Sequence, residues 1–120
     1  MKKKILFADD DGMLLKALVR LYGDLGFEAY GVDSPLKAEE SFREIKPDLA
    51  VFDYRMRGGG ESDTSGLDLA LKLAGEIPII MFSGDDQPDG VILPENMFWF
   101  SKWGKTQELH EKIKKLLKIE

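Results

Sequence analysis

The feature that most constrains the fold of this chain is a regular alternation of short apolar runs with longer segments of helical periodicity. The first run, Lys4–Ala8, ends at three consecutive aspartates, Asp9, Asp10 and Asp11. Similar runs follow at residues 27–32, 49–52, 77–82 and 97–100. Runs of this kind are typical of strands buried on both faces, and helix-sized segments between them predict a parallel sheet covered by helices on both sides.

The first two segments between the runs carry clear helix signals. In the first segment, leucines recur at helical spacing: Leu14, Leu18, Leu21 and Leu25. Gly26 suits the C-terminal end of this helix. In the second, Ser34 is a candidate N-cap, Pro35 suits the first helical position, and Pro47 ends the helix. Its apolar face consists of Ala38, Phe42 and Ile45.

The later segments are less regular. A long polar loop follows the third run, and Ser65 and Asp68 then resemble a capping box; the helix face would be Leu67, Leu71 and Ala74. Prolines and a glycine interrupt residues 85–94, so a helix there should be short or missing. A last helix is expected from about Thr106, with an apolar face of Leu109, Ile113, Leu116 and Leu117.

Composition excludes several classes of function. The 120 residues suit one domain spanning residues 1–120. The chain has no cysteine, which excludes disulfides, thiol catalysis and Cys-ligated metals. Its single histidine, His110, makes a His-rich metal site or a Ser–His–Asp hydrolase improbable.

Charge and hydropathy bear on partners and location. The net charge of −5, without a continuous basic surface, argues against direct nucleic-acid binding. The apolar stretch after the N-terminal lysines is too short for a signal peptide, and no stretch is long enough to span a membrane. We therefore expect a cytoplasmic protein.

Polar residues gather where the predicted strands end. Because reactive sites of open parallel sheets lie beyond the carboxyl ends of the strands, side chains from four strands should meet at one edge. They are Asp9, Asp10, Asp11, Asp53, Ser83 and Lys102.

The carboxylates predict a metal. Three carboxylates about 5 Å apart repel by roughly 3 kcal/mol per pair at an effective dielectric near 20, so the site should raise a pKa or attract a cation. Oxygen ligands alone favour Mg²⁺, with Mn²⁺ possible, and a phosphoryl group completes such a site naturally. Asp53 would be the nucleophile, while the Ser83 hydroxyl and the Lys102 charge would meet the phosphoryl oxygens.

In these residues the whole chain resembles the receiver domain of two-component response regulators. The resemblance rests on Asp9-Asp10 after the first strand, Asp53 after the third, Ser83 after the fourth and Lys102 after the fifth. It implies a flavodoxin-like fold with strand order 2-1-3-4-5. It also implies a phosphoacceptor signalling domain that regulates a partner and catalyses only its own phosphorylation and dephosphorylation.

The resemblance assigns roles residue by residue. Asp53 would take the phosphoryl group from a histidine kinase or histidine phosphotransfer protein. Asp10, Asp53 and the backbone carbonyl of Arg55 would hold Mg²⁺, with Asp9 reaching it directly or through water. Ser83 would move toward the phosphoryl group, and Trp99 stands at the family's aromatic switch position.

The sequence departs from the family pattern in three places. Arg57 stands where proline is usual, and residues 57–65 carry a glycine-rich insertion, which predicts a flap beside the site. Trp103 replaces the proline after Lys102. Because a non-proline cis bond costs about 3 kcal/mol, we expect a trans bond there. The broken stretch at 85–94 removes a helix that usually belongs to the output surface, so a partner would use a different face.

Arg55 stands two positions after the acceptor, near where Asp85 should leave the fourth strand. We hypothesise that the two side chains pair across the site entrance and slow hydrolysis of the acyl phosphate by hindering water.

Two alternatives come from other classes. The stretch Ile5–Leu15 also resembles the first motif of haloacid-dehalogenase-type phosphatases, with Asp9 as nucleophile and Asp11 as acid/base. In that alternative Met13 replaces the expected threonine, no acidic pair follows Lys102, and Asp53 has no role. The second alternative is a receiver-like binding module that no longer uses phosphate. The kinase, stimulus, output partner, oligomeric state and whether the chain is free-standing or part of a longer protein stay open.

Overall fold

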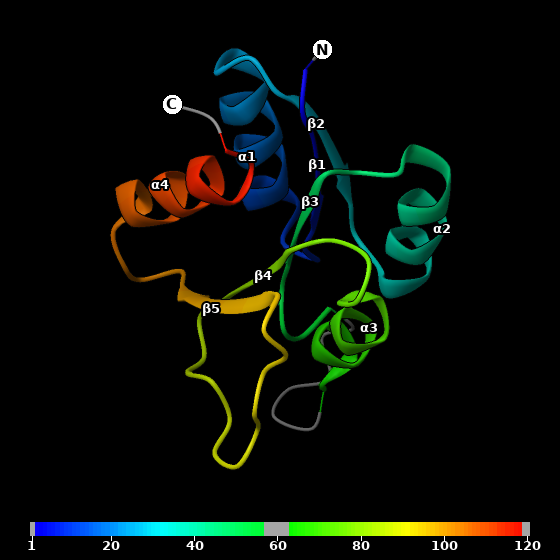
Figure 1. The fold of residues 1–120 in the computed structure, drawn as a ribbon, viewed down its shortest axis with the longest axis vertical. Helices are drawn as coiled ribbons and strands as arrows, with labels where there is room; N and C mark the ends of the chain where they lie inside the picture. Colours follow the sequence, from blue (N-terminus) through cyan, green and yellow to red (C-terminus); the bar gives the residue numbers. More distant parts are fainter. Residues whose placement is uncertain (1, 57–62, 119–120) are drawn as a thin grey trace.

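The chain forms a parallel sheet with helices on both faces, as a computed structural model shows (Figure 1). The structure describes residues 2–56 and 63–118. In chain order, its elements are β1 (Lys4–Ala8), α1 (Gly12–Asp24), β2 (Glu28–Val32), α2 (Pro35–Ile45), β3 (Leu49–Phe52), α3 (Ser65–Leu73), β4 (Ile79–Ser83), β5 (Met97–Ser101) and α4 (Thr106–Leu116).

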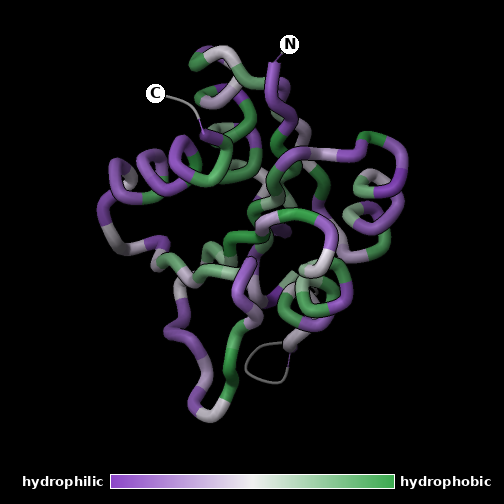
Figure 2. Tube along the Cα trace, viewed as in Figure 1, coloured by the Kyte–Doolittle hydropathy of each residue, from purple (hydrophilic) through white to green (hydrophobic). Residues whose placement is uncertain are grey.

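The strand order is β2-β1-β3-β4-β5, and every neighbouring pair is parallel. The predicted fold class is therefore confirmed. Successive side chains of a strand point to opposite faces, so each continuous apolar run supplies two cores. Leu6 and Phe52 belong to the core under α2 and α3, whereas Ile5 and Val51 belong to the core under α1 and α4. Figure 2 shows the apolar strands inside and the more polar surfaces of the helices outside.

The start of α2 and the end of α1 have the predicted causes. Ser34 Oγ accepts a hydrogen bond from the backbone N–H of Lys37, and Pro35 occupies the first helical position of α2. Gly26 follows the end of α1 and has a φ of 100°, a backbone conformation that is strained for residues with a side chain. Its N–H donates to the carbonyl of Gly23 in the last turn of α1.

The predicted apolar faces need correction in two helices. In α1, Leu21 and Leu25 stay about half exposed, and Tyr22 is the residue buried there. In α3, Leu71 is 43% exposed, whereas Leu69 and Leu73 are buried. Position on the sheet, rather than spacing alone, decides which side of a helix is covered.

The capping box predicted at Ser65 and Asp68 is wrong. The N-cap residue of α3 is Thr64, whose Oγ1 donates a hydrogen bond to Asp68 Oδ2 at 2.9 Å. The Ser65 side chain instead contacts the segment that follows β3, where Met56 N–H donates to its Oγ at 3.2 Å. Ser65 is therefore engaged in a tertiary contact and not in a local cap.

The connection from β4 to β5 contains no helix in residues 84–96, all of which the structure describes. This confirms the prediction from its prolines and glycine. The connection projects from the molecule as a long loop (Figure 1), and its returning part, Val91–Leu93, is apolar (Figure 2). Val91 and Leu93 pack against the α2–α3 core, while Ile92 is exposed. The loop thus covers part of the core that a helix would otherwise cover.

Two further sequence predictions concern local features. The peptide bond between Lys102 and Trp103 is trans, as expected. Most of the predicted glycine-rich flap, residues 57–62, lies outside the described residues.

Among the residues that are described, no helix combines the length and apolar character needed to cross a membrane.

Candidate functional site

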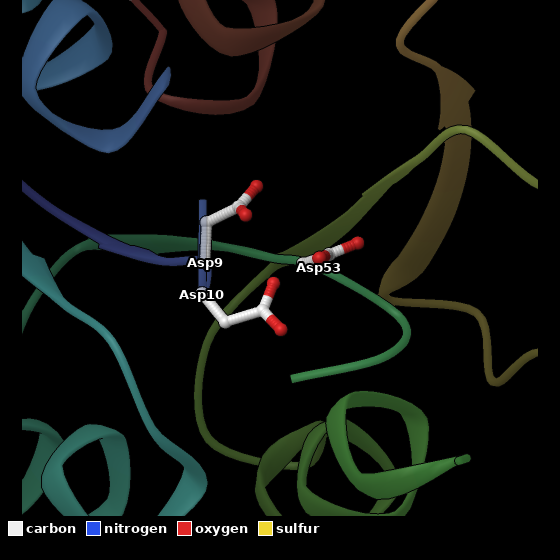
Figure 3. Close-up of side chains that lie close together, drawn as sticks. All are labelled: Asp9, Asp10 and Asp53. Carbon is white, nitrogen blue, oxygen red and sulfur yellow. The ribbon is translucent and has the colours of Figure 1, made fainter. Parts of the chain in front are cut away.

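The ends of β1 and β3 bring three aspartates together. The two strands pair in parallel with Ala8 opposite Phe52, so the residues that follow them leave the sheet side by side. The backbone N–H of Asp53 donates to the carbonyl of Ala8 at 2.8 Å, which extends the pairing into the site. Figure 3 shows the side chains of Asp9, Asp10 and Asp53 gathered beyond this edge of the sheet.

The three carboxylates are close enough to share one cation. Each offers an oxygen, and these oxygens all lie within 4.8 Å of one another. Asp9 is 3% exposed and Asp53 is 8% exposed, while Asp10 is open to solvent. The site is thus a partly buried acidic cluster with one open side.

Lys102 reaches this cluster from the end of β5. Its Nζ lies 2.9 Å from Asp9 Oδ2 and 3.4 Å from Asp53 Oδ1. Its backbone N–H donates to the carbonyl of Ser83 at 2.8 Å, which fixes the chain where β5 leaves the sheet. The Lys102 ammonium therefore bridges two of the three carboxylates.

Burial and charge perturb the two central groups. The pKa of Asp53 is raised from 3.8 to about 7, first by burial and then by the negative charge of Asp9, against the opposing effect of Lys102. Burial lowers the pKa of Lys102, but its hydrogen bond to Asp9 and the charge of Asp53 outweigh burial and raise that pKa overall. A buried carboxyl that is hard to ionise next to a firmly charged lysine suits a site that is completed by a cation.

The acidic cluster fits Mg²⁺ by the chemistry of its donors. Hard carboxylate oxygens, with no histidine or cysteine among them, favour Mg²⁺ or Mn²⁺ over softer metals. After burial, the negative charges of Asp9 and Asp10 contribute to the raised pKa of Asp53, and a divalent cation would neutralise that charge.

Ser83 is the last residue of β4, at the same edge of the sheet, and is 1% exposed. Its Oγ accepts a hydrogen bond from the backbone N–H of Asp85 at 3.0 Å. A hydroxyl that accepts one bond can still donate its proton. Ser83 therefore has the donor that an anionic group in the site would need.

Asp11, the third of the consecutive aspartates, serves a different purpose. Its Oδ1 accepts hydrogen bonds from the backbone N–H groups of Met13 and Leu14 and so caps the N-terminus of α1. It is exposed and does not belong to the cluster of three carboxylates. The acid/base role that the phosphatase alternative gave to Asp11 finds no support in this arrangement.

Arg55 and Asp85 form an ion pair beside the site. Arg55 Nε lies 2.9 Å from Asp85 Oδ2, and the guanidinium carbon stands 4.5 Å from the centre of the Tyr54 ring. Arg55 Nη1 also donates to the backbone carbonyl of Asp63 at 3.2 Å. The pair joins the segment after β3 to the segment after β4.

Two tryptophans hold the segment after β4. Trp99 Nε1 donates to the carbonyl of Asp85 at 2.9 Å, and its ring meets that of Tyr54 edge-on at 5.2 Å. Trp103 Nε1 donates to the carbonyl of Gly84 at 3.2 Å. Trp99 was a predicted site residue, but the contact of Trp103 was not foreseen, because a tryptophan after Lys102 carries no recognisable pattern in the sequence.

Sequence reasoning also missed Gly66. A side chain at this position would meet the backbone carbonyl of Asp53, since an added Cβ would lie 1.6 Å from that oxygen. A glycine inside a predicted helix face is the only signal that could have drawn attention to it.

The arrangement of strands, helices and acidic cluster defines the receiver fold. A response regulator from Clostridium difficile superposes with a TM-score of 0.82 at 20% identity, covering 98% of this chain and 97% of that chain. The activated N-terminal receiver domain of RstA from Klebsiella pneumoniae superposes with a TM-score of 0.80 at 23% identity, covering 96% and 98%. The resemblance to receiver domains is therefore confirmed at the level of the fold.

Sequence comparison points to the same class of protein. The DNA-binding response regulators MtrA of Mycobacterium tuberculosis and Mycobacterium leprae are each 27% identical to this chain over 95 residues. That match includes 78% of this chain but only 40% of each relative, so more than half of the length of these curated relatives has no counterpart in the match. No family model matches the chain. The relatives give no support to the phosphatase alternative.

Proposed function

We propose that this chain is the phosphoacceptor receiver domain of a two-component system, with Asp53 as the residue that takes the phosphoryl group. One observation carries the proposal: the buried Asp53 carboxylate lies beside two further carboxylates and within 3.4 Å of the Lys102 ammonium, at the carboxyl edge of a receiver sheet. The similarity to response regulators over 78% of the chain supports it.

The donor would be the phosphohistidine of a histidine kinase or histidine phosphotransfer protein. An ionised oxygen of Asp53 attacks phosphorus, a P–O bond forms, and the P–N bond to the donor breaks. The electron pair of that bond returns to the imidazole, which leaves as the neutral group once protonated. The Lys102 ammonium, 3.4 Å from Asp53, stabilises the negative charge on the phosphoryl oxygens, and the Ser83 hydroxyl donates a hydrogen bond to one of them.

The residues that would hold Mg²⁺ are Asp10, Asp53 and the backbone carbonyl of Arg55, with Asp9 acting directly or through water. When bound, the cation supplies positive charge that favours the ionised form of Asp53 and lowers the cost of bringing an anionic phosphoryl group into an acidic cluster. Mn²⁺ offers the same hard charge and can replace it.

The site acts on itself rather than on a released substrate, so the chain is a signalling domain and not an enzyme with a separate product. Loss of the phosphoryl group requires water to reach the acyl phosphate in line with the P–O bond. The ion pair of Arg55 and Asp85 joins the segment that follows Asp53 to the segment that follows Ser83, so it would stand beside that approach. We assign to this pair the role of a gate that slows hydrolysis.

The signal would leave the site through the segment after β4. Ser83 is the last residue before that segment, and Trp99 donates to the carbonyl of Asp85 within it. Movement of Ser83 toward a phosphoryl oxygen would shift Asp85 and so release or rotate Trp99. The downstream partner would be a protein. It would contact a face of the domain other than the one that a helix between β4 and β5 would form. With a net charge of −5, this chain is not itself expected to bind nucleic acid.

The test is the intact mass of the chain after incubation with Mg²⁺ and a small phosphodonor, beside Asp53→Asn. We expect one added phosphoryl group on the unaltered chain. The adduct should be absent from the variant and from samples without Mg²⁺.

An unmodified mass, with a known receiver domain phosphorylated under the same conditions, would contradict the proposal. It would favour the phosphate-independent binding module, in which the acidic cluster serves only the fold. Turnover that depends on Asp9 but not on Asp53 would favour the phosphatase.

A further inference from the structure

The start of α3 lies directly against the residues that follow β3. We refer to residues 53–56 as the acceptor turn, because Asp53 is the proposed phosphoacceptor and Arg55 offers the proposed carbonyl ligand. Three residues on the α3 side contact this turn: Asp63, Ser65 and Gly66. All three are buried, although they stand at the end of a polar stretch.

Gly66 makes the closest approach. Its backbone N–H donates to the carbonyl of Tyr54 at 2.9 Å. A Cβ at this position would lie 1.6 Å from the carbonyl oxygen of Asp53 and 2.9 Å from that of Tyr54. Atoms at 1.6 Å cannot coexist without a bond, so any side chain at position 66 would push α3 and the acceptor turn apart.

Ser65 and Asp63 hold the far end of the turn. The backbone N–H of Met56 donates to Ser65 Oγ at 3.2 Å, and Ser65 Oγ donates to Asp63 Oδ1 at 2.6 Å. Arg55 Nη1 donates to the backbone carbonyl of Asp63. The acceptor turn is thus bonded to the α3 side at Tyr54, Arg55 and Met56, on both sides of the proposed carbonyl ligand.

We propose that Ser65 and Gly66 are positioning residues that set the acceptor turn so that the Asp53 carboxylate and the Arg55 carbonyl face the same cation. This inference rests on the proposed function, and it goes further by placing part of the metal site's geometry in a segment without a metal ligand. Both residues act through backbone groups of the turn and touch neither the metal nor the phosphoryl group. Loss of such supporting contacts commonly weakens metal binding by about 10- to 100-fold.

Ser65→Ala is the first test, because it removes one hydroxyl and leaves the helix backbone free to form. The matched control is Thr64→Ala, one residue earlier. It also removes a hydroxyl at the start of α3, but one bonded to Asp68 within the same helix and not to the acceptor turn. The readout is the dissociation constant for Mg²⁺ alone, measured by titration calorimetry with both variants shown to be folded by circular dichroism.

We expect Ser65→Ala to bind Mg²⁺ at least about tenfold more weakly and Thr64→Ala to stay within about twofold of the unaltered chain. Gly66→Ala should show a still larger loss, whereas Gly75→Ala should show none, since an added Cβ there meets nothing within 4 Å. If Gly66→Ala does not fold, the serine and threonine pair decides the matter.

The possible failures are distinguishable. Unchanged Mg²⁺ affinity in Ser65→Ala overturns the positioning role and leaves the proposed function standing. Equal losses in Ser65→Ala and Thr64→Ala also overturn it, because they indicate a general loosening of α3. If the unaltered chain binds no Mg²⁺, both the inference and the metal-dependent part of the proposed function fail.

Discussion

Asp53→Asn should stabilise the metal-free protein, and the gain should depend on pH. The pKa of Asp53 is raised from 3.8 to about 7, so the folded chain binds a proton there more tightly than the unfolded chain does. Between these two pH values the folded state carries the extra proton. Stability is therefore lost as pH rises from about 4 to about 7, and the loss is complete above pH 7. Asparagine resembles the neutral acid and avoids this loss.

The magnitude follows from the same pKa. A tenfold change in proton affinity corresponds to about 1.4 kcal/mol, so the full change amounts to about 4 kcal/mol above pH 7. This is an upper bound, since Lys102 and water relax around the charge. We expect Asp53→Asn to raise the free energy of unfolding by about 1 to 4 kcal/mol at pH 8 and by much less near pH 4.

The assay is urea unfolding of both chains in chelator at pH 8 and pH 4, compared as the difference between the two at each pH. Asp86→Asn is the control: Asp86 is an exposed aspartate in the loop after β4 and should show little difference at either pH. Saturating Mg²⁺ should shrink or reverse the gain, because a ligand that binds only the folded, unaltered site stabilises it. A variant no more stable than the parent at pH 8, or equally stabilised at both pH values, would refute the reasoning.

Three further outcomes follow from the site. Arg55→Ala breaks the ion pair with Asp85 and should shorten the lifetime of the acyl phosphate, measured by intact mass over time; an unchanged lifetime would sink the gate, and Arg43→Ala, which breaks an exposed pair elsewhere, is the control. Lys102→Met leaves the buried Asp9 without its ammonium partner and should lower the free energy of unfolding at pH 8 by about 1 to 3 kcal/mol, measured by urea unfolding. An unchanged free energy of unfolding would show that this contact does not stabilise the fold. Trp99→Phe keeps the ring contact but removes the N–H donated to the carbonyl of Asp85, and should cost about 1 kcal/mol; equal stability in thermal unfolding would mean that this bond adds nothing.

Much of the site was predictable because parallel sheets impose a simple rule. Consecutive strands leave the sheet at the same edge, so Asp9, Asp53, Ser83 and Lys102 could be placed together from the ends of apolar runs alone. The absence of a helix between β4 and β5 followed from its prolines, which cannot supply the backbone donors that a helix needs. These are local properties of the chain, and a sequence displays them directly.

The sequence by itself therefore determined the class of fold, the edge at which the polar residues gather and the type of metal that their oxygens suit. Only the tertiary structure decided that Ser65 bonds to Met56 instead of capping a helix, that Gly66 lies against Asp53, and that Trp103 holds Gly84. Each of these contacts joins segments whose separation in space depends on how α3 packs against the sheet and how β5 pairs with β4. Periodicity and local propensity indicate where helices, strands and turns form along the chain. They do not give the distance between two segments that are far apart in the sequence, because the packing of the core between them sets that distance.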